Sequence, residues 1–163
     1  MVASCKKEAE ESIEITQNLD MDSRILNFDN TRVEGDAAQG NFYSSADSTK
    51  GFTIGYSYIV PDSLKNKKVK IYVSAMLREK ELPQQGDLVV VINSSKGNIA
   101  WQSIGRFGLK MAPNKWIKVN DSLEFSADKF NDPKIEIGVI GTKSQGGDAF
   151  DVDDLRVKFK FIK

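Results

Sequence analysis

VKIYVSAMLR, residues 69–78, alternates at every position between an aliphatic side chain and a side chain of another kind. A period of two residues is the pattern of a β-strand with one face buried. The predicted core side chains of this strand are Val69, Ile71, Val73, Ala75 and Leu77. The opposite face combines an aromatic ring, a hydroxyl, a thioether and a guanidinium group, carried by Tyr72, Ser74, Met76 and Arg78.

The same period of two extends along the chain on both sides of this strand. Further strands are predicted at residues 24–29, 51–60, 88–92, 98–103, 116–120, 122–125, 134–142 and 150–162, and residues 35–50 read as a loop. No stretch of ten or more residues carries a helical stripe. The sequence therefore predicts an all-β fold, a two-sheet antiparallel β-sandwich (jelly roll), and its uneven loops favour this over a closed barrel. Its remaining predicted core residues are Ile135, Ile137, Val139, Leu155, Val157 and Phe159.

The 163 residues suit one domain, which we place at residues 23–163. Residues 1–22 are charged at their start and lack aromatic side chains, so they are expected to form a flexible tether. A short helix over residues 8–15 is the alternative, although it has few apolar side chains to dock.

Charge and composition exclude several classes of function. Lys plus Arg and Asp plus Glu both number 23, and this zero net charge argues against a nucleic-acid partner. The chain has no histidine and one cysteine, which rules out Ser-His-Asp and Cys-His pairs, histidine-ligated metals and an internal disulfide. A carboxylate-based enzyme or, preferably, a binding or structural domain remains.

The single cysteine ends a run of small residues, Val2-Ala3-Ser4-Cys5. This run resembles the lipobox of bacterial lipoproteins, and the lysines and glutamate that follow are similar to the start of many Bacteroidetes lipoproteins. The resemblance implies lipidation of Cys5 and a bacterial outer-membrane or cell-surface address, with membrane contact only through the lipid anchor. The charged and apolar regions of a signal peptide are missing before it, which we interpret as trimming. The alternative is a stray cysteine in a flexible tail.

Four motifs occur in an order that points to a family. They are Asn27-Phe28-Asp29, the strand 69–78, Trp116-Ile117-Lys118-Val119 and the closing segment FDVDDLRV at residues 150–157. Together they resemble the jelly-roll carbohydrate-binding modules and the wider galactose-binding-like sandwiches, over about residues 24–163. The chain departs from that pattern at Asp29, where the family often has Glu, and in lacking an evident pair of tryptophans for sugar stacking.

A glycan or polysaccharide is the partner that this resemblance implies, bound on a concave sheet face. Sugars need flat apolar area together with hydrogen-bond donors, and the mixed face of residues 69–78 offers both. We place Tyr72 and Arg78 at the centre of the site, Trp101 at its flank, and Met76 and Asn93 beside them. The alternative is an ordinary sheet face packed under a loop.

Aspartates cluster in the last part of the chain, at Asp148, Asp151, Asp153 and Asp154. Their spacing alone favours a solvated strand entrance and does not match an EF-hand. The family resemblance, however, implies a structural calcium held by Asp29 and Asp153, tying the first strand to the last.

Three functions are left open. The first is a non-catalytic carbohydrate-binding surface lipoprotein domain, and the second is a structural or protein-interaction sandwich without a sugar ligand. The third is a small glycan-active enzyme, for which Glu79, Glu81, Glu136 and Asp148 are candidate carboxylates with no spacing that singles out a pair. The oligomeric state is not predicted.

Overall fold

The computed structural model describes residues 12–23, 31–81, 86–104, 112–143 and 149–162. The strands in this part of the chain are β1 (Ser12–Leu19), β2 (Arg32–Glu34), β3 (Phe42–Ala46), β4 (Tyr56–Ile59), β5 (Lys68–Glu79), β6 (Gly86–Ser94), β7 (Gly97–Ser103), β8 (Ile117–Phe125), β9 (Ile135–Lys143) and β10 (Phe150–Ile162). Two short 3₁₀ turns accompany them, η2 (Asp62–Leu64) and η3 (Ala127–Phe130). Among the described residues, no helix has the length and apolar character needed to cross a membrane.

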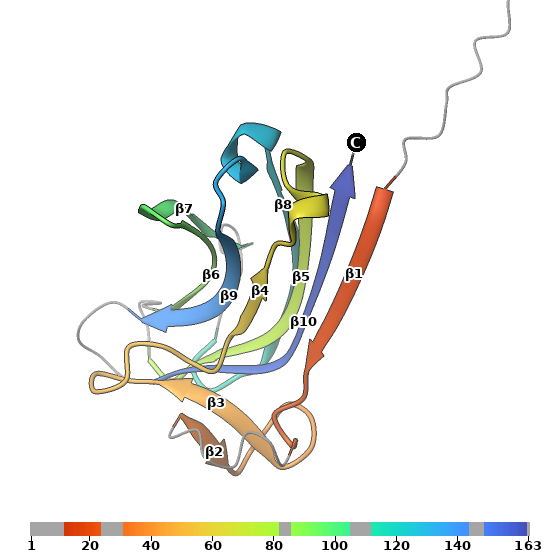
Figure 1. Cartoon of the computed structure of the whole chain (residues 1–163). Coiled ribbons are helices and arrows are strands. Elements are labelled where there is room, and N and C mark those ends of the chain that lie inside the picture. The colour runs from red at the N-terminus through yellow and green to blue at the C-terminus, as the bar shows by residue number, and fades with distance from the viewer. Residues whose placement is uncertain (1–11, 24–30, 82–85, 105–111, 144–148, 163) are drawn as a thin grey trace, which may run out of the picture.

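The strands form two antiparallel sheets that face each other (Figure 1). In the described residues the larger sheet has the order β2-β3-β10-β5-β8, with β1 also paired to β10, and the smaller sheet has the order β4-β9-β6-β7. The fold is therefore the predicted two-sheet antiparallel β-sandwich of jelly-roll type. The ribbons of β6 and β9 bow toward the larger sheet, so the outer face of the smaller sheet is concave (Figure 1).

The core lies between the two sheets, where alternate side chains from both are buried. Every predicted core residue of β5, β9 and β10 is inside, and the most exposed of them, Val73 and Leu77, are only 3% exposed. Aromatic rings on β4 reach across to β10, since Tyr58 stacks on Phe159 with 5.2 Å between ring centroids. The strand register inferred from the sequence is thus confirmed for these three strands.

A β-bulge in β10 changes which residues of that strand face the core. Its pairing with β5 shifts between Asp153 and Arg156, and Asp154 takes a positive φ of 46°. Before the bulge Phe150 and Val152 are buried, and after it the buried set is Leu155, Val157, Phe159 and Phe161. The inserted residue lets even-numbered and odd-numbered positions of one strand point to the same core. The partner of β10 changes there as well, from β3 to β1.

Three predicted boundaries are wrong. The expected loop at residues 35–50 contains β3, whose Tyr43 is buried, and the two strands expected at residues 116–125 are one continuous strand, β8. The strand expected over residues 51–60 shortens to β4, and Phe52 lies outside it and is 50% exposed. The strand expected at residues 24–29 lies outside the described residues.

The N-terminal segment also differs from its prediction. Ser12–Leu19, assigned above to a flexible tether, is the strand β1 and pairs with β10 along its whole length, from Ser12 with Ile162 to Leu19 with Leu155. The alternative of a helix over residues 8–15 is likewise wrong for the residues from Ser12 onward. Ile15 and Leu19 pack against the core, which gives this polar strand two apolar contacts.

Candidate functional site

The structure places the predicted binding residues on two different sheets. Tyr72, Met76 and Arg78 lie on β5 and face outward from the larger sheet. Asn93 and Trp101 lie on β6 and β7 of the smaller sheet. Because the two sheets face each other across the core, their outer faces point in opposite directions. The prediction of one surface centred on Tyr72 and Arg78 with Trp101 at its flank is therefore wrong.

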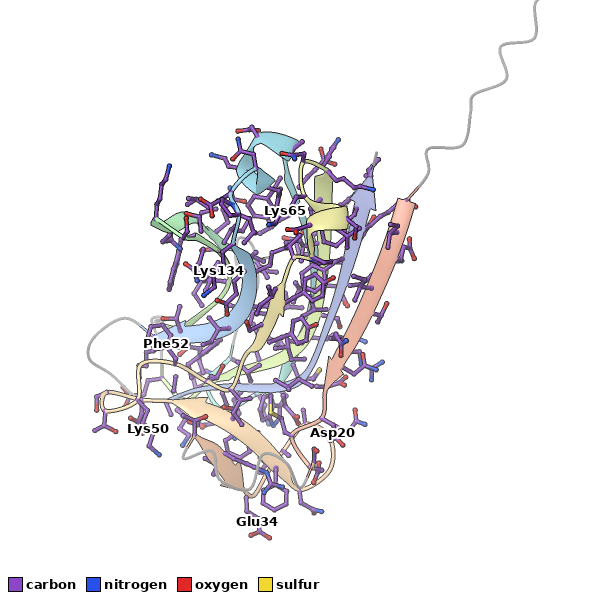
Figure 2. All side chains as sticks on the ribbon, in the orientation of Figure 1. Asp20, Glu34, Lys50, Phe52, Lys65 and Lys134 are labelled. Carbon is purple, nitrogen blue, oxygen red and sulfur yellow. The ribbon has the colours of Figure 1, made fainter. Side chains whose placement is uncertain are left out.

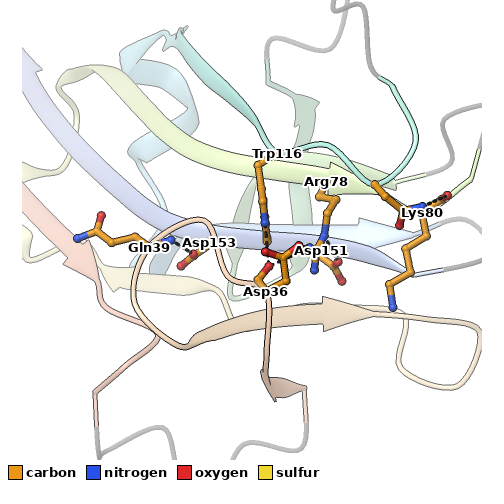
Figure 3. Close-up of polar contacts among 8 residues, drawn as sticks. Asp36, Gln39, Arg78, Lys80, Trp116, Asp151 and Asp153 are labelled. Atoms are coloured by element: carbon orange, nitrogen blue, oxygen red, sulfur yellow. Dashed lines mark hydrogen bonds and ion pairs between the residues drawn. The ribbon is translucent and has the colours of Figure 1, made fainter.

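Arg78 lies in a closed cluster of charged and aromatic groups (Figure 3). Its Nε donates to Asp151 Oδ2 at 2.8 Å, and its Nη1 donates to the backbone carbonyl of Asp36 at 2.8 Å. The guanidinium carbon lies 4.3 Å from the ring centroid of Trp116 and 4.7 Å from that of Tyr43. Trp116 Nε1 donates to the same carbonyl of Asp36, so the loop at Asp36 covers the arginine.

This cluster corrects the role predicted for Arg78. Its side chain is 6% exposed, and the Asp151 side chain beside it is 0% exposed, so neither is open to solvent. The physical cause is the register of β5 with β10, which sets Arg78 directly opposite Asp151. Met76 is half-buried next to this cluster, in register with Asp153 and Lys118.

A groove crosses the concave outer face of the smaller sheet. Its hollow has a volume of about 340 Å³. The residues that line it come from β4, β6, β7 and β9 and from the segment before β4. They are Phe52, Gly55, Tyr56, Ser57, Val91, Asn93, Trp101, Glu136, Gly138 and Ile140. Hollows of this size are typical of small-ligand sites.

Strand register brings the polar and aromatic groups of the groove together. Asn93 on β6 pairs with Glu136 on β9, and Val91 pairs with Trp101 on β7. Trp101 is 51% exposed. Ser57 donates its hydroxyl hydrogen bond to Glu136 Oε1, which fixes that carboxylate against β4. A second exposed ring, Phe52, lies at the end of β9, where it bridges to Thr142 (Figure 2).

The floor of the groove is flat because a glycine occupies its centre. Gly138 pairs with Val91 on one side and with Ser57 on the other. A Cβ atom built on Gly138 would come no closer than 3.8 Å to its neighbours, the nearest being the Tyr56 carbonyl and Val91 Cβ. A larger side chain would therefore fit the strand and project into the hollow.

The sequence analysis did not assign several of the groove residues to a binding site. Glu136 was considered only as a catalytic carboxylate, and Phe52 was not considered as a binding residue. The alternation of β9 already placed Glu136 outward, between the buried Ile135 and Ile137, and this signal could have found it. Its neighbours across the sheet depend on strand order, which periodicity does not give.

Tyr72 lines a separate, wider hollow of about 720 Å³ on the outer face of the larger sheet. Of the predicted binding residues, Tyr72 is the one that borders it. Asn93 and Trp101 thus line the groove and Tyr72 lines this hollow, whereas Met76 and Arg78 line neither.

The described residues do not by themselves form the calcium site that the family resemblance implies. Asp153 Oδ2 accepts the backbone N–H of Gln39 at 2.9 Å (Figure 3). Its Oδ1 accepts the backbone N–H of Asp154 at 2.7 Å. Burial raises the pKa of the Asp153 carboxyl above its usual value, against the opposing effect of these backbone amides. Among the described residues no three acidic, histidine or cysteine side chains gather as metal ligands would. Asp29, Asp148 and Cys5 lie outside the described residues, so calcium binding and lipidation stay predictions.

Comparison with known proteins bears on the fold. No protein-family model matches the chain, and no curated protein matches it. Solved structures that resemble it include the CBM22-1 xylan-binding domain of Paenibacillus barcinonensis Xyn10C, at 15% identity and a TM-score of 0.48, covering 81% of this chain and 80% of that one. They also include the VP2 subviral particle of infectious bursal disease virus, at 12% identity and a TM-score of 0.51. That match covers 99% of this chain, which spans about a third of the viral chain.

A second xylan-binding domain of the same Paenibacillus enzyme, CBM22-2, is similar at 14% identity, with a TM-score of 0.48 and coverage of 77% of this chain and 83% of that one. Two xylan-binding domains are therefore among the solved structures that resemble the chain. At these identities the likeness concerns the fold alone.

Proposed function

We propose that the domain binds a carbohydrate chain in the groove of the smaller sheet, without cleaving it. The observation that carries this proposal is the half-exposed ring of Trp101, which lies beside Asn93 and Glu136 in a concave hollow. An indole ring supplies flat apolar area for the C–H face of a sugar, and the amide and carboxylate supply hydrogen-bond partners for its hydroxyls.

The exposure of the two rings supports a ligand. Trp101 and Phe52 are each about half exposed on one face, whereas the other large aromatic side chains of the smaller sheet, Tyr56 and Tyr58, pack on the core. Exposed apolar area gathered in a hollow is a mark of binding sites, since solitary exposed residues are scattered over most surfaces.

The carboxylates of the groove support binding without catalysis. Glycoside hydrolysis ordinarily uses two carboxyl groups on either side of the scissile bond. Among the described residues that line the groove, Glu136 is the one carboxylate. Its Oε1 already accepts the hydroxyl hydrogen bond of Ser57.

Replacement of the indole tests the proposal. The parent protein is titrated with soluble neutral polysaccharides, among them xylan, mixed-linkage glucan and galactomannan, and the ligand that binds is carried forward. Trp101→Ala should then weaken binding at least about 30-fold, since removal of a central aromatic anchor commonly costs about 2 kcal/mol or more. Calorimetry gives the dissociation constants.

Tyr72→Ala is the matched control, because it removes a ring from the opposite outer face and should leave the neutral ligand's affinity unchanged. Equal losses in the two variants would contradict the assignment to the groove. If no polysaccharide binds the parent protein, the carbohydrate proposal fails and the sandwich is a structural or protein-interaction domain.

We propose a lipid-anchored address at a bacterial surface on sequence alone. The support is the Val2–Cys5 run and its resemblance to a lipobox. Incorporation of a labelled fatty acid by the full-length protein in its host, lost in Cys5→Ala, is the expected result. Labelling that persists in Cys5→Ala would contradict it.

A further inference from the structure

The outer face of the larger sheet carries a second hollow whose chemistry differs from that of the groove. It spans β1, β10, β5 and β8 and has a volume of about 720 Å³. Strand register arranges its side chains in two rows, Thr16–Lys158–Tyr72–Ser122 and Asn18–Arg156–Ser74–Asn120. Hydroxyls and amides dominate these rows, so the hollow suits a ligand rich in hydrogen-bonding groups.

The next row of this face places two lysines opposite each other. Glu14, Lys160, Lys70 and Glu124 follow one another across β1, β10, β5 and β8. Like charges directly opposite one another on adjacent strands are destabilising. In the described part of the chain, neither Lys70 nor Lys160 makes an ion pair, because Glu14 bridges Lys158 at 2.9 Å and Glu124 bridges Lys68 at 2.6 Å.

Tyr72 holds cationic groups at the edge of the hollow. Lys70 Nζ lies 5.1 Å from its ring centroid, and Lys158 Nζ lies 5.4 Å from it. Both distances are within the range of cation–π attraction. The Tyr72 ring therefore attracts two ammonium groups at the edge of the hollow.

Carboxylates on this face leave those cations only partly neutralised. Arg156 Nη2 contacts Asp154 Oδ1 at 2.9 Å, and Asp121 lines the rim at β8, where its Oδ1 accepts the backbone N–H of Ser122. The pKa of the Glu14 carboxyl is lowered, chiefly by the hydrogen bond from Lys158. Lys160 lowers it further by charge attraction without a direct hydrogen bond. In the described part of the chain, Lys70 and Lys160 thus keep no carboxylate partner, whereas Lys158 is bridged to Glu14.

We propose that this hollow binds an acidic oligosaccharide, one that carries carboxylate or sulfate groups. Its acidic group would lie among Lys70, Lys158 and Lys160, and its hydroxyls would contact the amide and hydroxyl rows. The repulsion between Lys70 and Lys160 destabilises the free protein. In the complex, the anionic group of the ligand would give both lysines an oppositely charged partner. The site is separate from the groove, which is proposed to take a neutral glycan and whose described lining has a carboxylate, Glu136, and no lysine or arginine.

The test compares two lysine pairs. Lys70→Gln/Lys160→Gln removes the opposed cations, and Lys96→Gln/Lys129→Gln removes two exposed lysines from another hollow, beside η3. Each protein is titrated at low salt with tetragalacturonate, with a heparin-derived tetrasaccharide, with neutral xylotetraose and with inorganic sulfate alone. The first two ligands separate carboxylate from sulfate as the recognised group.

We expect the acidic tetrasaccharide to bind the parent protein, and its affinity to fall about tenfold or more in Lys70→Gln/Lys160→Gln. Affinity should stay at the parent value in the control pair and in Trp101→Ala, and the parent's binding should weaken as salt is added. The unfolding midpoint of Lys70→Gln/Lys160→Gln should equal or exceed that of the parent, because a repulsion has been removed.

Three results would overturn the proposal. In the first, the parent binds the acidic tetrasaccharides no more tightly than xylotetraose. In the second, both lysine pairs weaken binding equally, which is the mark of unspecific charge attraction. In the third, inorganic sulfate alone binds as tightly as the tetrasaccharides. Because the neutral ligand and Trp101 report on the groove, each of these results leaves the groove proposal standing.

Discussion

Arg78, which the sequence analysis placed in a ligand-binding site, instead stabilises the fold. Its guanidinium lies between the rings of Tyr43 and Trp116 and is bonded to Asp151 and Asp36. These contacts join β5, β10 and the loop before β3. In the described structure Asp151 Oδ1 is buried without a hydrogen-bond partner, so this carboxylate depends on Arg78 for its compensation.

Removal of Arg78 should therefore destabilise the protein strongly. Arg78→Ala leaves a buried carboxylate without its cation, and the free energy of unfolding should fall by about 3–5 kcal/mol. Urea unfolding followed by tryptophan fluorescence measures it. Arg78→Met/Asp151→Leu removes both charges and should recover part of the loss. A loss below about 1 kcal/mol in Arg78→Ala would show that the cluster is open to water.

The Asp153 carboxyl should make stability depend on pH. Burial raises its pKa above the ordinary value of 3.8, so the folded protein binds this proton more tightly than the unfolded chain does. The resulting stabilisation is present at low pH and is lost as the pH rises through the raised pKa. The free energy of unfolding of the parent, minus that of Asp153→Asn, should decrease between pH 4 and pH 7.

Urea titrations at a series of pH values, with a chelator present, give this difference. A difference that grows with pH would mean that the backbone amides of Gln39 and Asp154 stabilise the anion more than burial penalises it. The same titrations repeated with added calcium test the metal prediction. A higher unfolding midpoint in calcium, reversed by the chelator, is the result expected if Asp29 and Asp153 hold the ion.

At the scale of the element, strands with one strict alternation were predictable and strands with a break were not. β5 and β9 keep one register from end to end, and their core faces follow directly from the sequence. In β10 the buried apolar residues have even numbers before the bulge at Asp154, as at Phe150 and Val152, and odd numbers after it, as at Leu155 and Val157. A strict period of two over residues 150–162 cannot represent that shift.

β1 and β3 were among the least predictable strands. β1 pairs with β10 through eight residue pairs, yet its side chains are mostly exposed, so its sequence lacks the apolar face by which strands are recognised. β1 is held in place by backbone hydrogen bonds to the long neighbouring strand β10. β3 was missed for a related reason, because it buries serines and an alanine where sequence reasoning expects larger apolar residues.

At the scale of the whole molecule, the two outer faces of the sandwich have different chemistry. The smaller sheet is concave and shows exposed aromatic rings around one carboxylate. The larger sheet shows amides, hydroxyls and lysines. The sequence predicted residues from both faces as one site, because a two-residue period tells which side of a strand a residue faces and leaves the sheet unassigned. Trp101 and Asn93 lie on one sheet because β6 and β7 pair with each other.

The central claim is that the groove over Gly138 is where a neutral glycan binds, and filling that groove tests it most directly. Gly138→Val adds a side chain above the floor, and the nearest neighbours of its Cβ lie at 3.8 Å, an ordinary contact. Valine also suits a strand better than glycine does, so the free energy of unfolding should not fall.

The measurement is the calorimetric binding isotherm of Gly138→Val with the neutral polysaccharide that binds the parent, alongside its urea unfolding curve. We predict no detectable glycan binding together with parent-like or greater stability. A folded Gly138→Val protein that binds the glycan as tightly as the parent would contradict the account.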